Sequence, residues 1–333
     1  MNSQQASHAP DRILKGIRQS PRVPAPSQVV SKILSITRNP DCDYQAVAEL
    51  IQRDSALTAE LLRQTNSALY AGAKTTSSVK DACVRLGLKR VRAVVINDHI
   101  VSGMGQACPP GFQPNLYWQA ALATSVAAKE LARTLDPNAI EDAATAGLLV
   151  DVGIGLLAYG ASAAYGEVLR QLSSCLSSNI EELERRILGI THSEVAAAVF
   201  ADWKLDEHLI DAVRRHHLVT TTAECADAPR LSRIVGAAVT CSEIALGGSD
   251  MEIVERLFEQ LDGLTPKPDE LVGRLLDQLV VQIQKTAEDL SIELGETGQM
   301  ASNFAQVAGC LPNVGAQLSH RPMSRSAFDL ESL

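Results

Sequence analysis

Apolar residues recur every three or four positions through most of this chain between residues 28 and 294. This spacing forms one face of an α-helix, whereas a half-buried strand would alternate every second residue. Residues 44–54, 116–135 and 206–217 show the helical pattern, and no convincing alternation appears anywhere. Aromatic residues make up only 4% of the chain, which favours closely packed helices built on Ala, Leu, Val and Ile. The sequence predicts an all-α fold, a helical bundle without significant sheet.

Changes in composition divide the chain. Residues 1–20 are polar and are expected to form a flexible tail, followed by the proline-rich stretch PRVPAPS at 21–27. The segment CPPGFQPN at 108–115 is the clearest internal break. Apolar periodicity ends near residue 312, so residues 312–333 are expected to form a second flexible tail. We expect helical lobes at 21–107 and 108–220, then a helical extension at 221–311 that packs on the second lobe.

The net charge of −9 disfavours a surface for duplex nucleic acid, which needs clustered Lys and Arg. A short basic face at Lys89, Arg90 and Arg92 keeps a transcriptional regulator open as an alternative. Seven scattered cysteines without a CxxC pair are typical of a reduced, cytoplasmic protein rather than a disulfide framework or zinc site. No apolar leader occurs at the N-terminus.

The stretch LLVDVGIGLLA at 148–158 is an apolar helical run with one carboxylate, Asp151, in its middle. A charge at the centre of a membrane span costs about 2.5–3.5 kcal/mol, so this region is expected to form buried helices rather than a span. A buried acid usually has a partner or a chemical role.

Three histidines on predicted helices provide candidate partners for Asp151: His192, His216 and His217. Imidazoles and carboxylates that converge on one point are what a metal-dependent hydrolase needs. A histidine pair at a helix end is also typical of a solvated cap, and His192 could equally pack in the core. Thr191 with Glu194 predicts a capping box before the helix of His192, and Asn138 with Glu141 predicts another.

Several separated motifs resemble a known family. GLLVDVGIGLLA resembles the GLLHDIGKLLLA segment of HD-type metal-dependent phosphohydrolases, and residues 187–217 are similar to the region that follows it. VPAPSQVVSKILSITRNPDCDYQAVAELIQRDSALTAELLRQTNSALYAG and VKDACVRLGLKRVRAVVI follow the pattern of the HDOD module. The resemblance covers about residues 22–220. It implies a two-lobed, HD-like helical fold and an output module of bacterial signalling proteins, generally without catalytic activity.

The resemblance also shows which ligand positions have changed. Ala120 stands where the first metal-binding histidine falls, and Val150 aligns with the histidine of the HD doublet. The late aspartate has no clear match, and the nearest positions are Val239 and Thr240. Valine and alanine cannot coordinate a cation. We therefore expect a vestigial site without catalytic residues, metal or cofactor, in which four positions of the ancestral set remain: Asp151, His192, His216 and His217.

The stretch NSALYAG supplies a family signature, formed by Asn66, Ser67, Ala68 and Tyr70. No nucleophile–base pair follows from these residues. Asn competes well for exposed backbone groups, so Asn66 is expected to bond the backbone at a helix end.

The leading functional expectation is a non-catalytic, cytoplasmic HDOD signalling or scaffold protein that acts through protein contacts. The resemblance places it in cyclic-dinucleotide-linked signalling, with partners of the GGDEF/EAL or kinase type. A divergent HD-type phosphohydrolase and a transcriptional regulator remain the alternatives. The long helix predicted at 268–294 either packs back on the bundle, which the short heptad pattern favours, or pairs with a second copy to form a homodimer.

Overall fold

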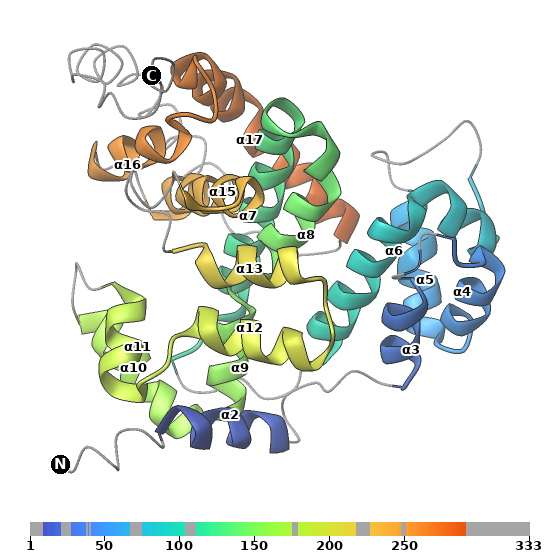
Figure 1. Cartoon of the computed structure of the whole chain (residues 1–333), viewed down its shortest axis with the longest axis horizontal. Helices are drawn as coiled ribbons and strands as arrows, with labels where there is room; N and C mark the ends of the chain where they lie inside the picture. Colours follow the sequence, from blue (N-terminus) through green and yellow to red (C-terminus); the bar gives the residue numbers. More distant parts are fainter. Residues whose placement is uncertain are drawn as a thin grey trace, which may run out of the picture.

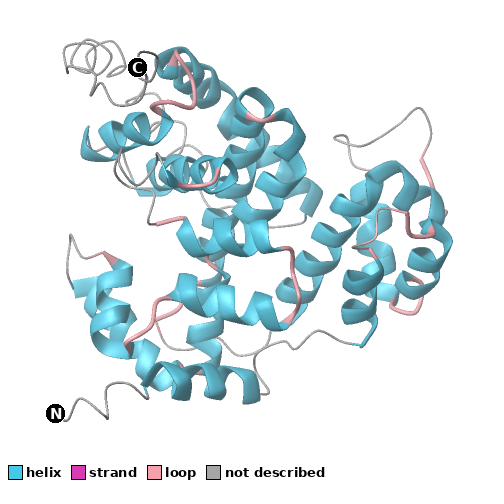
Figure 2. Cartoon of the chain, viewed as in Figure 1, coloured by secondary structure: helices cyan, strands magenta, loops and turns pink. Residues whose placement is uncertain are grey.

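The structure, a computed structural model, describes residues 9–20, 28–37, 39, 41–66, 75–103, 111–174, 179–217, 227–247 and 251–290. These residues form α-helices and one short 3₁₀ helix, and no strand occurs among them (Figure 2). The predicted all-α fold is confirmed. The tail predicted at 312–333 lies outside the described residues.

The N-terminal lobe is a small bundle at one side of the molecule (Figure 1). Leu and Ile side chains at helical spacing, among them Ile33, Ile51 and Leu61, form its buried core. A left-handed backbone at Gly87 (φ 75°) bends the last helix of the lobe, where the sequence indicates a helix stop. The helices are α3 (Gln28–Ile36), α4 (Tyr44–Ile51), α5 (Ser55–Thr65) and α6 (Val79–Gly103).

The second lobe and the C-terminal helices form the larger part of the molecule. Helix α7 lies at their centre and packs against α8, α15 and α17. The elements are α7 (Pro114–Leu135), η1 (Pro137–Ala139), α8 (Ile140–Leu149), α9 (Val152–Gly160), α10 (Ser162–Ser174), α11 (Ile180–Leu188), α12 (His192–Asp202), α13 (Glu207–Arg215), α15 (Arg230–Gly247), α16 (Met251–Leu261) and α17 (Pro268–Leu290).

Helix α17 buries its apolar face inside the chain. Its leucines share one core with residues of α7 and α15, such as Leu131 and Ile234. The helical stripe that could have paired with a second copy is thus covered by the chain's own helices. The buried residues of this stripe are Leu271, Leu275, Leu276, Leu279 and Ile283.

Residues 9–19 form a helix, α2 (Ala9–Gln19), rather than part of a flexible tail, which corrects the expectation for 1–20. Ile13, Leu14 and Ile17 recur at helical spacing, and Ile17 is fully buried. Helix α2 packs on α9, and Arg18 forms an ion pair with Asp202 at 2.6 Å. The segment therefore belongs to the second lobe, away from the N-terminal bundle that follows it in sequence (Figure 1).

Ion pairs join α6 to the second lobe. The basic residues of α6 considered above as a nucleic-acid face each meet an acid that is remote in sequence. This face is therefore an internal contact between the lobes. The pairs are Lys89 with Asp142 at 2.7 Å, Arg90 with Glu141 at 3.2 Å and Arg92 with Asp206 at 2.8 Å.

The apolar segment 137–160 is long enough and apolar enough to cross a membrane by composition alone. However, 83% of its most apolar window is buried against other parts of the chain. This burial is that of core helices, as the sequence predicts for the region around Asp151.

Asp98, half-buried on α6, provides a test of electrostatics in the N-terminal lobe. Burial, together with the carboxylates of Glu60 and Asp54, raises its pKa to about 6. Because the pKa is lower in the unfolded chain, near 4, the free energy of unfolding should fall as the pH rises from about 4 to 6. We expect Asp98→Asn to raise it by about 1 kcal/mol at pH 7.5, allowing for solvent screening. At pH 4 the change should be small.

Urea unfolding at both pH values measures this effect. Asp81→Asn, at an exposed position on the same helix, is the matched control and should give no gain at either pH. Equal effects of Asp98→Asn at pH 4 and pH 7.5 would contradict the raised pKa.

Candidate functional site

Asp151 lies at a break between two helices, not within one continuous helix. Helix α8 ends at Leu149, and Asp151 occupies the position before α9, where its side chain makes no capping hydrogen bond. The carboxylate is therefore available for contacts with other elements. It faces His192 and His216, and 17% of its side chain is exposed.

His192 is the first residue of α12. The predicted capping box is present: Thr191 accepts a hydrogen bond from the backbone N–H of Glu194, and the Glu194 side chain accepts one from Thr191. This cap fixes the start of the helix and buries His192 completely. The second predicted box is absent, because Asp136 caps the turn that precedes α8.

His216 is the C-cap of α13, and His217 follows it. The Nδ1 atom of His216 lies 2.6 Å from the carbonyl oxygen of Val213, one turn earlier in the chain. The rings of His216 and His217 lie 4.1 Å apart between centroids, and the ring of His192 lies 5.1 Å from that of His217. The pair thus points back into the lobe toward α12.

All four residues singled out in the sequence converge at one centre. One ligand atom from each lies within 4.8 Å of those of the others. The Nε2 atoms of His192 and His216 are 3.3 Å apart. Oδ1 of Asp151 is 3.7 Å from the first and 3.6 Å from the second. We call this set the Asp151 centre.

A buried acid that the sequence analysis missed supports the Asp151 centre. Glu184 of α11 is completely buried, and its Oε2 accepts hydrogen bonds from His192: the backbone N–H at 2.7 Å and Nδ1 at 2.8 Å. Its Oε1 accepts the hydroxyl of Tyr165 at 2.8 Å. A sequence signal existed, because Glu184 falls in the stripe formed by Ile180 and Leu188 at intervals of four.

Gly153 of α9 allows the close approach of α12 behind the Asp151 centre. A Cβ atom at this position would overlap the backbone carbonyl of His192. Only glycine therefore permits the present distance between these two helices.

Burial and neighbouring charges set the protonation of the Asp151 centre. Burial alone would raise the pKa of Asp151, but hydrogen bonding to His216 and the charges of His216 and His192 lower it overall. Burial opposes the protonation of His192, but the nearby Glu184 carboxylate outweighs it and raises the pKa. Burial and the charges of His216 and His192 hold the pKa of His217 well below its usual range.

The positions that lack a ligand are filled by apolar or bonded groups. Val150 is completely buried in a small core with Val239. The hydroxyl of Thr240 donates to Gln260 at 2.8 Å, and Ala120 offers only a methyl group. Among the described residues, the Asp151 centre therefore presents four donors, which fit one cation.

The family signature has a structural role at the one residue that can be placed. Asn66 ends α5, and its amide bonds both polar groups of the Thr76 backbone, each at 2.9 Å. This is the backbone contact at a helix end that the sequence predicts for Asn66. Ser67, Ala68 and Tyr70 lie outside the described residues.

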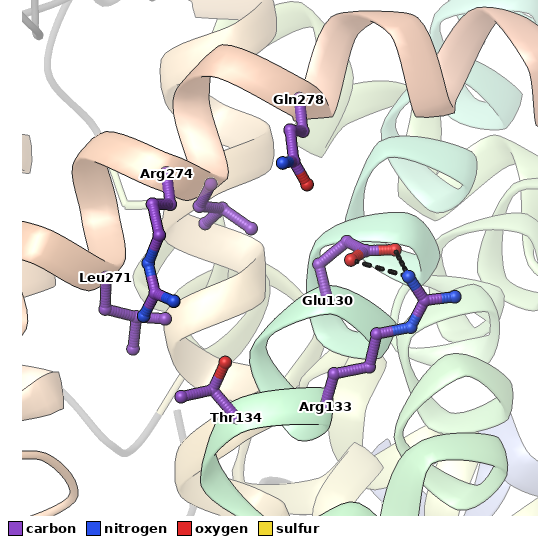
Figure 3. A pocket seen from close by; sticks show the side chains of 7 residues that line it. Glu130, Arg133, Thr134, Leu271, Arg274 and Gln278 are labelled. Carbon is purple, nitrogen blue, oxygen red and sulfur yellow. Dashed lines mark hydrogen bonds and ion pairs between the residues drawn. The ribbon is translucent and has the colours of Figure 1, made fainter.

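A hollow of about 250 Å³ lies elsewhere, between α7 and α17 (Figure 3). Arg133 turns toward Glu130 and pairs with it at 3.0 Å. Arg274 donates to the backbone carbonyl of Glu270. None of the residues of the Asp151 centre lines this hollow, which is bounded by Glu130, Arg133, Thr134, Leu271, Arg274, Leu275 and Gln278.

Several solved structures share the fold of this chain. An HDOD domain protein of unknown function from Geobacter sulfurreducens superposes with a TM-score of 0.63 at 24% identity, covering 84% of this chain and 98% of that one. A proposed phosphohydrolase from Shewanella amazonensis gives 0.58 at 21% identity, covering 92% and 97%. A proposed signal transduction protein from Marinobacter aquaeolei gives 0.59 at 20%, covering 86% and 66%. These identities establish a shared fold.

Sequence comparison gives the family. An uncharacterized protein of Treponema pallidum is 30% identical over 198 residues, which are 57% of this chain and 37% of that protein. The matched segment thus spans little more than a third of that relative. The HDOD domain family matches residues 23–219, more than half of the chain. This chain belongs to the HDOD domain family.

Proposed function

We propose that this protein is a non-catalytic HDOD signalling protein that acts through contacts with other proteins. One observation carries the proposal: the Asp151 centre keeps four donors, while positions 120, 150, 239 and 240 supply no further ligand. A hydrolytic metal needs an open position for water as well as its protein ligands. Around a four-coordinate ion such as zinc, three histidines and one aspartate would occupy every position and leave none for water.

The family match supports the proposed signalling role, and the pairing of the basic residues of α6 argues against DNA binding. The resemblance to HDOD modules implies an output module of bacterial signalling proteins, so GGDEF/EAL-type proteins and kinases are the proposed partners, in the cytoplasm. The basic face of α6 is paired within the chain, which disfavours the alternative of a DNA-binding regulator. A homodimer would need a surface other than the buried stripe of α17.

Turnover assays test the non-catalytic part. The full chain, loaded in turn with Mn²⁺, Mg²⁺ or Zn²⁺, is incubated with cyclic dinucleotides, (p)ppGpp and a generic phosphodiester. We expect no hydrolysis above that of an Asp151→Ala variant. Asp202→Ala, which removes an acid paired with Arg18 at the surface, is the control for a general effect of losing a carboxylate.

The convergence of four donors favours one rival, a divergent phosphohydrolase. Turnover that Asp151→Ala abolishes and Asp202→Ala preserves would establish this rival and refute the proposal. Cross-linking in the native cell tests the signalling part: a reproducible signalling partner supports it, and its absence counts against it.

A further inference from the structure

The geometry points to a binding site for one divalent transition metal ion of the zinc class, formed by Asp151, His192, His216 and His217. This inference concerns the Asp151 centre itself and stands apart from the proposed signalling role. It departs from the sequence-based expectation that no metal is bound, and it keeps the expectation that the protein is not a phosphohydrolase.

The Nδ1 atoms of His192 and His216 form hydrogen bonds away from the Asp151 centre. In a neutral ring, these bonds determine that Nε2 carries the lone pair and faces the centre. A carbonyl oxygen only accepts, so Nδ1 of His216, next to the Val213 carbonyl, carries a hydrogen. Glu184 likewise accepts from the backbone N–H and Nδ1 of His192. Neutral rings of this kind therefore present Nε2 of His192 and of His216 as acceptors.

In their neutral forms these acceptors face one another, and without a cation a proton must be shared among them. The two Nε2 atoms are 3.3 Å apart, and Oδ1 of Asp151 lies 3.6 Å and 3.7 Å from them. Lone pairs at such separations repel unless a cation lies among them. One proton can satisfy only one pair, whereas a divalent ion satisfies all the donors together.

The distances and donor types match zinc. Metal–ligand bonds of about 2.0–2.1 Å place tetrahedral ligand atoms about 3.3 Å apart. The separations of 3.3, 3.6 and 3.7 Å among His192, His216 and Asp151 lie close to this value, and all four donors, His217 included, lie within 4.8 Å of one another. Imidazole nitrogens with one carboxylate oxygen are donors that zinc accepts readily.

The charges around the Asp151 centre also suit a divalent cation. Asp151 supplies one negative charge as a direct ligand. The Glu184 carboxylate supplies a second negative charge behind His192, to which it is hydrogen-bonded. A carboxylate that holds the far nitrogen of a ligand histidine is a common support of zinc sites. Glu184 is thus a positioning residue, which is itself held by the Tyr165 hydroxyl.

Tyr117 provides an independent observation. Its buried hydroxyl has no hydrogen-bond partner among the described residues, and it lies close enough to Asp151 for that charge to act on it. It precedes Ala120 by one turn of α7. A buried phenol rarely stays unpaired. Its unpaired hydroxyl therefore marks unsatisfied polarity in the part of the lobe where the charge of Asp151 acts.

Metal loading of the stripped full chain tests the site. After chelator treatment, the chain is given Zn²⁺ or Co²⁺ and desalted. We expect one ion retained per chain, the strong visible absorption of tetrahedral Co²⁺, and a midpoint of thermal unfolding raised by roughly 4 °C at zinc 100-fold above Kd.

His217→Ala is the informative variant, because His217 is partly exposed and its loss should leave the fold intact. It should weaken zinc binding roughly 100-fold or more, beyond the 10–100-fold typical of losing a supporting residue. Glu184→Gln should weaken it within that 10–100-fold range. His208→Ala, which removes a half-exposed imidazole near Asp142, is the matched control and should keep full binding.

Absence of retained metal with a native circular dichroism spectrum would overturn the proposed site. Equal losses in His217→Ala and His208→Ala would also overturn it, because binding would then lie at the surface. Bound metal with hydrolytic turnover would support the site and refute the non-catalytic function. Absence of metal would leave that function standing, so the two proposals can fail separately.

Discussion

Glu184→Ala is expected to lower the free energy of unfolding by about 3–5 kcal/mol, the usual cost of breaking a buried, charged network by removing one partner. The change leaves the backbone N–H and Nδ1 of His192 and the Tyr165 hydroxyl without their acceptor. All three groups are buried where water cannot replace the carboxylate. Urea unfolding at pH 7.5, followed by circular dichroism, measures the loss.

Three further variants separate the contributions. Glu182→Ala, at an exposed position on α11, should change the free energy of unfolding by less than about 0.5 kcal/mol. Tyr165→Phe removes one hydrogen bond and should cost about 1 kcal/mol. Glu184→Gln keeps the shape and one acceptor oxygen, so its cost should fall between those of Tyr165→Phe and Glu184→Ala. A Glu184→Ala variant as stable as Glu182→Ala would show that the network is not needed for folding.

Much of the fold could be predicted from the chain because its signals are local. Helical spacing of apolar residues and the capping box at Thr191 concern neighbours within a few positions, and both are found in the structure. The donors of the Asp151 centre were also identifiable, because an acid in an apolar run and a histidine pair stand out in the sequence. Their convergence was not, since it depends on how α9, α12 and α13 pack.

The features that escaped prediction all depend on remote contacts. Glu184 belongs to a short, highly charged helix, where its place in the stripe of Ile180 and Leu188 hints at burial but its partners, Tyr165 and His192, are known only from the fold. Helix α2 has only three large apolar residues in a polar segment, and it packs on α9, α11 and α12, all more than 130 residues away in the chain.

The basic residues of α6 were conspicuous in the sequence, but their partners could not be predicted from it. In the sequence, Lys89 and Arg90 form a basic face that could meet nucleic acid. In the fold they meet Asp142 and Glu141, which lie about 50 positions farther along the chain. A local charge pattern therefore identifies an interaction surface without identifying the partner, and here the partner is the second lobe itself.

The close contact between Gly153 and the backbone of His192 predicts a second large loss of stability on mutation. Gly153→Ala is expected to lower the free energy of unfolding by about 3 kcal/mol, because the new methyl group would overlap the backbone carbonyl of His192. Backbone cannot rotate away as a flexible side chain can, so α9 and α12 must separate. His192 would then move away from His216 and Asp151, and zinc affinity should fall together with stability.

Gly166→Ala is the matched control. Gly166 lies inside α10, and an added Cβ atom there would meet nothing within 4 Å. Alanine is the better helix former, so this variant should be more stable by up to about 1 kcal/mol. Urea unfolding and zinc titration of both variants measure the contrast. If the two substitutions shifted stability in the same direction, the close approach of α9 to His192 would not constrain the Asp151 centre. Opposite signs would show that a single methyl group next to the backbone decides whether the four donors can meet.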